Sequence, residues 1–161
     1  MLPSVIATIA PITAADLGAA GEMLRLTLIE NCVDPNVIAE HYVADWIGCC
    51  APVLGARVGG QLVGYATLER IPGPGAFGVV ALSVLSRYRR RGLGEKLLRA
   101  LLTEAQRAGE ISEVWLSVAP DNLPARALYE KLCFAAHLNP PPTMFVPAKY
   151  LTLVWRPDTL A

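Results

Sequence analysis

The sequence lacks an excess of charge of either sign and any long apolar run, and each absence narrows the possible functions. It has 14 Lys and Arg residues against 14 Asp and Glu residues, so its formal net charge is zero. A general nucleic-acid binder usually carries a basic excess, so we expect no nucleic-acid partner. No apolar stretch reaches the ~18 residues of a membrane span, and the N-terminus lacks the pattern of a secretory signal. These absences predict a cytoplasmic protein without a membrane partner.

Metal-ligand patterns are also missing. The histidines and cysteines are His41, His137, Cys32, Cys49, Cys50 and Cys133. No two cysteines have a C-x-x-C spacing, and the histidines do not complete a zinc pattern. We therefore expect no metal, and we expect free thiols in a reducing compartment.

What is present suggests one α/β domain spanning residues 1–161. A chain of 161 residues fits a single domain, and its apolar share of 53% suits a sheet buried on both sides. Short apolar runs predict strands at 4–9, 52–58, 61–68, 77–85, 114–118, 134–138 and 150–155. Helical spacing predicts helices at about 13–29, 34–46, 93–108 and 123–132, the third of them ended by Gly109.

Local signals support these elements. Thr13 and Asp16 resemble a capping box, and Asp34-Pro35 is a further helix start. Gly59-Gly60 predicts a tight hairpin, because glycine accepts a positive φ at little cost. The prolines and glycines of 71–75 predict a turn. Strand–helix–strand units in the second half imply parallel pairing, so a mixed sheet with helices on both faces follows.

One loop stands out as a candidate binding site. Arg87, Arg89, Arg90 and Arg91 are followed directly by Gly92-Leu93-Gly94 and a strongly periodic helix. Arginines alone would suggest only a solvated loop, but two glycines at a helix start need a reason. Close approach of a phosphate to the unpaired N–H groups of the helix N-terminus is such a reason. The Walker and dinucleotide loops do not match, because the order here is R-x-x-G-x-G.

Two blocks of residues carry a family resemblance. The first contains Leu82-Ser83-Val84, Tyr88-Arg89, Gly92-x-Gly94 and Leu97-Leu98. The second contains Val-Trp-Leu-Ser-Val at 114–118, followed by Asn122, Ala125, Tyr129 and Cys133-Phe134. They resemble the acyl-CoA loop and the following Asn-Ala-Tyr block of the GCN5-related N-acetyltransferases (GNAT). Within that family they are most similar to the ribosomal-protein N-terminal acetyltransferase subgroup. The blocks are specific over residues 79–134, and the order of elements extends the resemblance more weakly over the whole chain.

The resemblance implies a fold and a donor, acetyl-CoA. The fold would be α/β (α+β in some schemes), with a mostly antiparallel sheet of six to seven strands. About four helices would cover both its faces, and it would be splayed between strands 4 and 5. The implied donor contacts are Leu82, Ser83 and Val84 for the pantetheine arm, and Arg89, Arg90, Arg91, Gly92, Leu93, Gly94 and Glu95 for the pyrophosphate. Asn122 would also contact the cofactor, and Tyr129 would lie near its sulfur.

The resemblance offers a candidate for the general acid but does not assign the general base. Tyr129 is the candidate general acid, because a phenol can protonate a departing thiolate. Relatives carry a glutamate five residues before the Asn, where this chain has Ser117, and the fourth strand holds none. Ser117 could at most position a water, and Glu69 is the nearest other carboxylate in the sequence. His41 and Tyr150 are weaker candidates, so the base is unassigned.

The family resemblance and the unassigned base leave two hypotheses for the function. The first is direct transfer of the acetyl group of acetyl-CoA to a primary amine of a small molecule or peptide in a ternary complex. The alternative is a non-catalytic acyl-CoA sensor or regulatory module that lost the base. The sequence does not identify the acceptor amine, and we expect a monomer or a homodimer.

Overall fold

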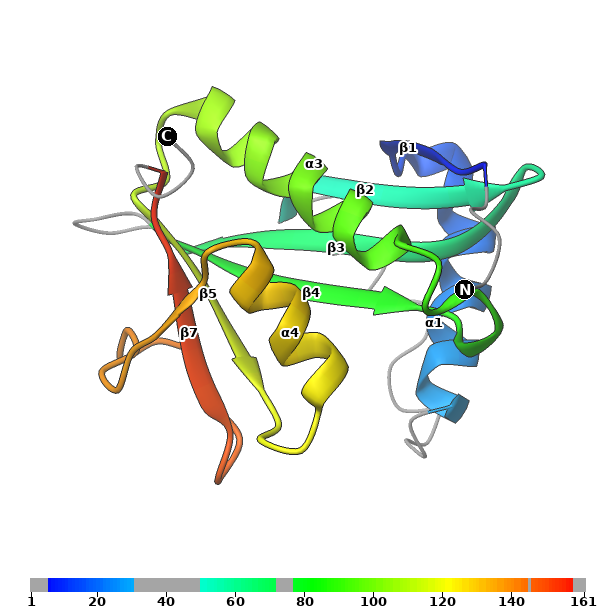
Figure 1. The fold of residues 1–161 in the computed structure, drawn as a ribbon. Helices are drawn as coiled ribbons and strands as arrows, with labels where there is room; N and C mark the ends of the chain where they lie inside the picture. The colour runs from blue at the N-terminus through cyan, green and yellow to red at the C-terminus, as the bar shows by residue number, and fades with distance from the viewer. Residues whose placement is uncertain (1–5, 31–49, 72–76, 145, 158–161) are drawn as a thin grey trace.

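The computed structural model describes residues 6–30, 50–71, 77–144 and 146–157. Its centre is a seven-stranded sheet with the order β1-β2-β3-β4-β5-β7-β6 (Figure 1). The strands are β1 (Thr8–Pro11), β2 (Cys50–Val58), β3 (Gln61–Ile71), β4 (Phe77–Val84), β5 (Glu113–Val118), β6 (Ala135–Ala136) and β7 (Leu151–Trp155). All neighbouring pairs are antiparallel except β4 and β5, which are parallel. The mixed, mostly antiparallel sheet that the sequence predicts is therefore confirmed.

The β2–β3 hairpin lies between β1 and β4 in the sheet. Gly59 and Gly60 connect the two strands with φ angles of 55° and 82°, which residues with a side chain rarely adopt. The predicted Gly-Gly hairpin is confirmed. This tight turn fixes the register in which β2 pairs with β3, and β3 in turn pairs with β4, the strand beside the candidate site.

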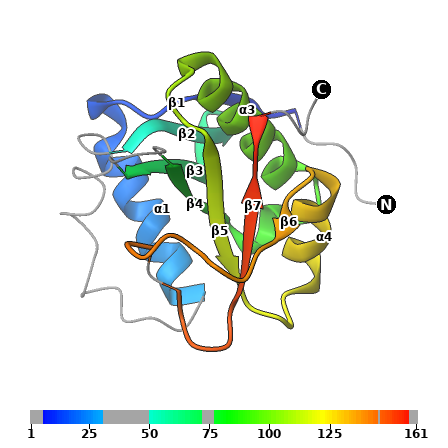
Figure 2. The same cartoon turned by 90° about the vertical axis from the view of Figure 1, so that its left-hand side faces the viewer.

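Helices cover both faces of the sheet. The helix α1 (Leu17–Glu30) lies on one face, while α3 (Leu93–Ala108) and α4 (Leu123–Lys131) lie on the other (Figure 2). The chain enters α1 through a short 3-10 turn (Ala14–Asp16), where the Thr13–Asp16 capping box is present. The Asp16 carboxylate also accepts a bond of 2.6 Å from Arg57 of β2, so the helix start is tied to the sheet.

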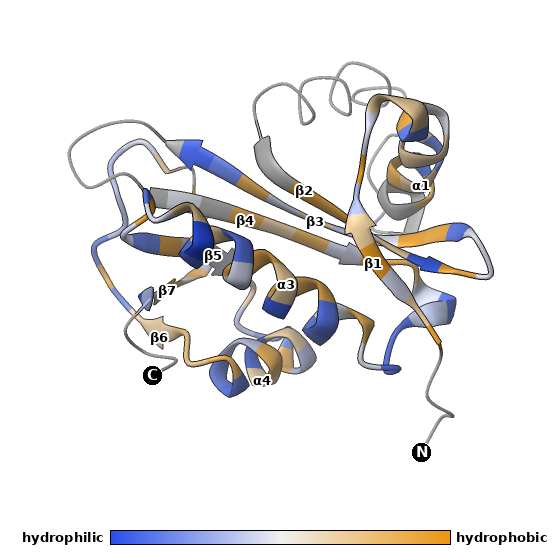
Figure 3. Cartoon of the chain, turned by 90° about the horizontal axis from the view of Figure 1, so that it is seen from above, coloured by the Kyte–Doolittle hydropathy of each residue, from blue (hydrophilic) through white to orange (hydrophobic). Residues whose placement is uncertain are grey.

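The helix α3 supplies much of the core. Its buried residues recur at helical spacing and comprise Leu93, Leu97, Leu98, Leu101, Leu102 and Ala105. Figure 3 shows its hydrophobic residues turned to the sheet and its hydrophilic ones turned outward. Gly109 ends the helix in the left-handed conformation, with φ of 68°. Because the apolar face is anchored so firmly, the N-terminus of α3 has a fixed position beside the end of β4.

The strands β4 and β5 separate soon after they begin. Their ladder joins Phe77, Gly78 and Val79 to Glu113, Val114 and Trp115. Beyond Val79, β4 continues to Val84 without a β5 partner, and the two strands diverge in Figure 1. This is the splay that the family resemblance implies, and it opens the sheet next to α3 and α4.

Some boundaries differ from those expected. The first strand covers Thr8–Pro11 rather than 4–9, and the strand expected at 134–138 is reduced to Ala135–Ala136. The helix expected at 34–46, with His41, lies outside the described residues, as does the turn expected after Ile71. Among the helices that the structure describes, none is long and apolar enough to cross a membrane.

Candidate functional site

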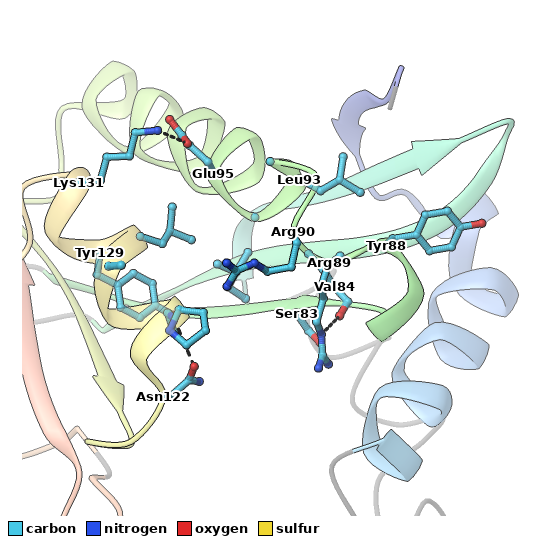
Figure 4. A pocket seen from close by; sticks show the side chains of 17 residues that line it. Ser83, Val84, Tyr88, Arg89, Arg90, Leu93, Glu95, Asn122, Tyr129 and Lys131 are labelled. Atoms are coloured by element: carbon cyan, nitrogen blue, oxygen red, sulfur yellow. Dashed lines mark hydrogen bonds and ion pairs between the residues drawn. The ribbon is translucent and has the colours of Figure 1, made fainter. Parts of the chain in front are cut away.

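A pocket opens where β4 and β5 separate, between the N-terminus of α3 and the helix α4 (Figure 4). Its volume of about 760 Å³ lies within the range of small-molecule sites. Its walls come from the end of β4, the turn before α3, and α4. The lining residues are Leu82, Ser83, Val84, Tyr88, Arg89, Arg90, Gly92, Leu93, Gly94, Glu95, Asn122, Pro124, Ala125, Ala127, Leu128, Tyr129 and Lys131.

The turn before α3 presents backbone N–H groups to this pocket. Arg90 and Gly92 both have left-handed backbones, with φ angles of 62° and 78°. Gly92 is the N-cap of α3, and the first helical bond runs from the Lys96 N–H to the Gly92 carbonyl at 3.1 Å. The N–H groups of Gly94 and Glu95 precede that bond and have no acceptor within the helix. Such a helix start favours an anion.

The arginines of the loop have different surroundings. The Nε atom of Arg89 donates a bond of 2.8 Å to the carbonyl of Val84, so this side chain folds back on the end of β4. The side chain of Arg90 extends into the pocket (Figure 4). Arg91 does not line the pocket, and its guanidinium lies 5.9 Å from the centre of the Tyr88 ring. The three arginines that the sequence groups together are thus placed differently.

The second loop glycine keeps the pocket open. A Cβ atom on Gly94 would lie 3.5 Å from Cδ2 of Leu128 and 4.0 Å from Cδ2 of Leu82, both of which line the pocket. A methyl group would fit there, but a larger side chain would extend between β4 and α4. Gly94 therefore preserves space for a ligand, whereas Gly92 provides a backbone conformation.

Asn122 and Tyr129 both reach the pocket from α4. Asn122 is the N-cap, and its Oδ1 accepts a bond of 3.3 Å from the Ala125 N–H. Tyr129 lies two turns further on, and its ring centre is 5.8 Å from that of Phe134. Burial raises the pKa of Tyr129 above its ordinary value of 10, so its hydroxyl is protonated at neutral pH. That state is the one that a proton donor requires.

The two candidates for the base lie outside this pocket. Ser117 is half-buried on β5 and pairs with Thr152 of β7. Glu69 is exposed on β3 and pairs with Val79, the last residue of β4 that has a β5 partner. Cross-strand partners share a face of the sheet, so Glu69 lies on the same face as Trp115 and Ser117. Both candidates are near the point where the strands part, and neither is brought to Tyr129.

The structure adds two findings that sequence reasoning missed. Lys131 lines the pocket, and its Nζ lies 2.7 Å from the Glu95 carboxylate. The spacing of Pro124, Leu128 and Lys131 along one helix face could have revealed it. Cys133 is exposed and has a left-handed φ of 65°. Its position in the turn therefore requires a backbone conformation rather than a side chain.

Comparison with known proteins agrees with this geometry. The model of the acetyltransferase (GNAT) family matches residues 23–134. The chain belongs to the GNAT family. It is therefore an N-acetyltransferase that transfers an acetyl group to an amine, as the sequence resemblance implies.

Individual GNAT proteins show the same likeness. An N-alpha-acetyltransferase of Saccharolobus solfataricus is 38% identical over 68% of this chain and 69% of its own length. The N-alpha-acetyltransferase RimI of Mycobacterium tuberculosis is 43% identical, over half of each chain. An N-acetyltransferase of Thermoplasma acidophilum in complex with coenzyme A superposes with a TM-score of 0.67, at 18% identity, over 94% of this chain and 99% of that one. This last likeness concerns the fold.

Proposed function

We propose that this chain is a protein N-α-acetyltransferase that transfers the acetyl group of acetyl-CoA to the amine at the N-terminus of a peptide. The observation that carries the proposal is one pocket that joins a phosphate-type helix start to a half-buried, protonated Tyr129. The names of the relatives from Saccharolobus and Mycobacterium support the α-amine as acceptor.

The residues of the pocket fit such a donor. Its charged lining residues are Arg89, Arg90, Lys131 and Glu95. Three cations and one carboxylate leave two net positive charges, which suits the anionic end of acetyl-CoA. Leu82 and Leu128 provide apolar wall on either side of Gly94, which suits a mainly apolar arm. Beyond Val79 the edge of β4 has no β5 partner, so it can pair with amides of that arm.

When bound, acetyl-CoA supplies an activated acetyl group. The bond between the carbonyl carbon of this group and the sulfur breaks, and a bond between the same carbon and the amine nitrogen forms. The chain must then provide a proton for the sulfur and remove one from the nitrogen. We assign the first task to the Tyr129 hydroxyl, which its raised pKa keeps protonated. Phe134 packs against its ring and fixes its position.

For the amine proton we propose a water molecule held by the Ser117 hydroxyl. Ser117 follows Trp115 on the same face of β5, just past the last residue paired with β4. Glu69 lies on that face too and can receive the proton through water. Serine itself is too weakly basic to do so.

The proposal is tested by acetylation of peptides. We expect the protein to acetylate a peptide that has a free N-terminal amine. It should leave unchanged a peptide of the same sequence whose N-terminus is blocked and whose lysine is free. Mass spectrometry of both products checks this. Acetylation of the lysine alone would contradict the α-amine assignment. Tight CoA binding without acetylation of any amine would instead favour the sensor role.

A further inference from the structure

We propose that Lys131 is a second, separate phosphate contact of the pocket, which recognises the phosphate on the ribose 3′ position of the acyl donor. The inference rests on the proposed use of acetyl-CoA. It extends that proposal by assigning a residue that discriminates CoA from the same molecule without this phosphate.

Lys131 enters the pocket from the wall opposite the phosphate loop. It is the last residue of α4, and its Nζ lies 2.7 Å from Oε2 of Glu95, in the first turn of α3 (Figure 4). Both side chains line the pocket. The ion pair therefore crosses from one helix to the other and holds the ammonium group at the pocket wall.

Glu95 is neutralised twice, so it does not cancel the charge of Lys131. The Nη2 atom of Arg99 lies 3.0 Å from Oε1 of the same carboxylate. These partners hold the pKa of Glu95 below its usual value, through the hydrogen bond to Lys131 first and that to Arg99 second. Two cations and one carboxylate leave one net positive charge. An ammonium group has three donors, so Lys131 can keep Glu95 and still bind a phosphate oxygen.

The chemistry of the donor matches two cationic walls. CoA carries a pyrophosphate within its chain and a separate phosphate on the ribose. The backbone of residues 90–95 offers one anion site, at the start of α3. We assign the pyrophosphate to that turn, so the phosphate on the ribose needs a further cation. Lys131 is the cation that α4 contributes to the lining.

Arg99 offers a matched control. Arg99 and Lys131 are both exposed and pair with the same carboxylate, but only Lys131 lines the pocket. Arg99→Met therefore removes an equal charge at the same ion-pair cluster without removing the proposed phosphate contact. Lys131→Arg keeps the charge at that position.

The experiment measures by calorimetry the affinities of CoA and 3′-dephospho-CoA for the wild type and for the variants Lys131→Met, Lys131→Arg and Arg99→Met. We expect the wild type to bind CoA about tenfold more tightly, as one charge-assisted hydrogen bond would give. Lys131→Met should bind both ligands with the same affinity, close to that of the wild type for 3′-dephospho-CoA. Arg99→Met and Lys131→Arg should retain the preference.

The outcomes separate the two proposals. Equal affinities in the wild type, or a preference that survives in Lys131→Met, would overturn the role of Lys131 while the acetyltransferase assignment stands. Loss of the preference in Arg99→Met as well would show a general effect of charge and would also overturn it. Failure of the wild type to bind either ligand would contradict the proposed donor itself.

Discussion

The Nε atom of Arg89 donates a hydrogen bond of 2.8 Å to the backbone carbonyl of Val84. This bond ties the turn before α3 to the last residue of β4, across the short 3-10 turn Ser86–Tyr88. The first arginine of the R-x-x-G-x-G pattern thus holds the loop in shape, while its neighbour Arg90 extends into the pocket. The two residues should respond differently to mutation.

Replacing each arginine with methionine tests this division. Arg90→Met should weaken CoA binding about tenfold, because one charge-assisted contact is lost, and should leave thermal stability unchanged. Arg89→Met should also lower the free energy of unfolding by about 1 kcal/mol, the usual loss for one hydrogen bond. Calorimetry and thermal denaturation measure the two effects. Equal loss of stability in both variants would contradict the division.

Tyr129→Phe should lower kcat by roughly 10²- to 10³-fold, the usual contribution of a general acid. KM should change little, because the ring and its packing on Phe134 remain. The pH profile supplies a second test. Tyr129 must be protonated to donate, and burial raises its pKa above 10. The wild-type kcat should therefore show no fall due to Tyr129 below pH 10 and should decline only above it.

Substitution of the two loop glycines should have different effects, one on CoA binding and the other on stability. Gly94→Val should abolish CoA binding with little change in stability, because its side chain would extend between Leu82 and Leu128. Gly92→Ala should lower the free energy of unfolding by about 1 kcal/mol, since alanine is strained at a φ of 78°. Denaturant titration together with CoA binding distinguishes them. Unchanged CoA affinity in Gly94→Val would contradict the placement of the donor.

The proposed water path predicts different effects for Ser117 and Glu69. Ser117→Ala should lower kcat about tenfold, because a water-mediated hydrogen bond of ordinary strength is lost. Glu69→Gln should lower kcat by less, because bulk water can still take up the proton that this carboxylate receives. Steady-state kinetics between pH 5 and pH 10 measure both. Wild-type profiles in both variants would show that bulk water receives the proton directly.

Cys133→Gly should stabilise the protein by up to about 1 kcal/mol, because glycine is not strained at a left-handed φ. Cys133→Ala is the control, and it should leave stability nearly unchanged, since the side chain is exposed. Both values come from denaturant titration, and activity should be unaffected. A loss of stability in the glycine variant would show that the thiol itself contributes.

Features that depend on local chemistry could be predicted from the sequence. The Gly59-Gly60 turn, the Thr13–Asp16 box and the Asn122 cap each follow from neighbouring residues, and each is present. The loop and α4 were expected to form one site because their spacing matched a known family. The pocket brings residues of the β4 end and of the loop, among them Ser83, Arg90 and Gly94, together with Asn122 and Tyr129.

Features that depend on tertiary contacts could not be predicted in this way. Lys131 and Glu95 are 36 residues apart, and nothing local signals their meeting. The separate roles of Arg89, Arg90 and Arg91 depend on how the turn is folded, because all three look alike as a run of charge. The left-handed φ of Cys133 likewise depends on how the chain turns after α4, and the residue type does not signal it.

The early end of the β4–β5 ladder at Val79 has a further consequence. A donor that pairs with the part of β4 that has no β5 partner would behave as an added strand, so its binding would be a form of β-augmentation. Its departure would then require several backbone hydrogen bonds to open together. The release of product, and with it the turnover rate, would depend on the backbone of residues 80–84 rather than on side chains that a substitution can remove.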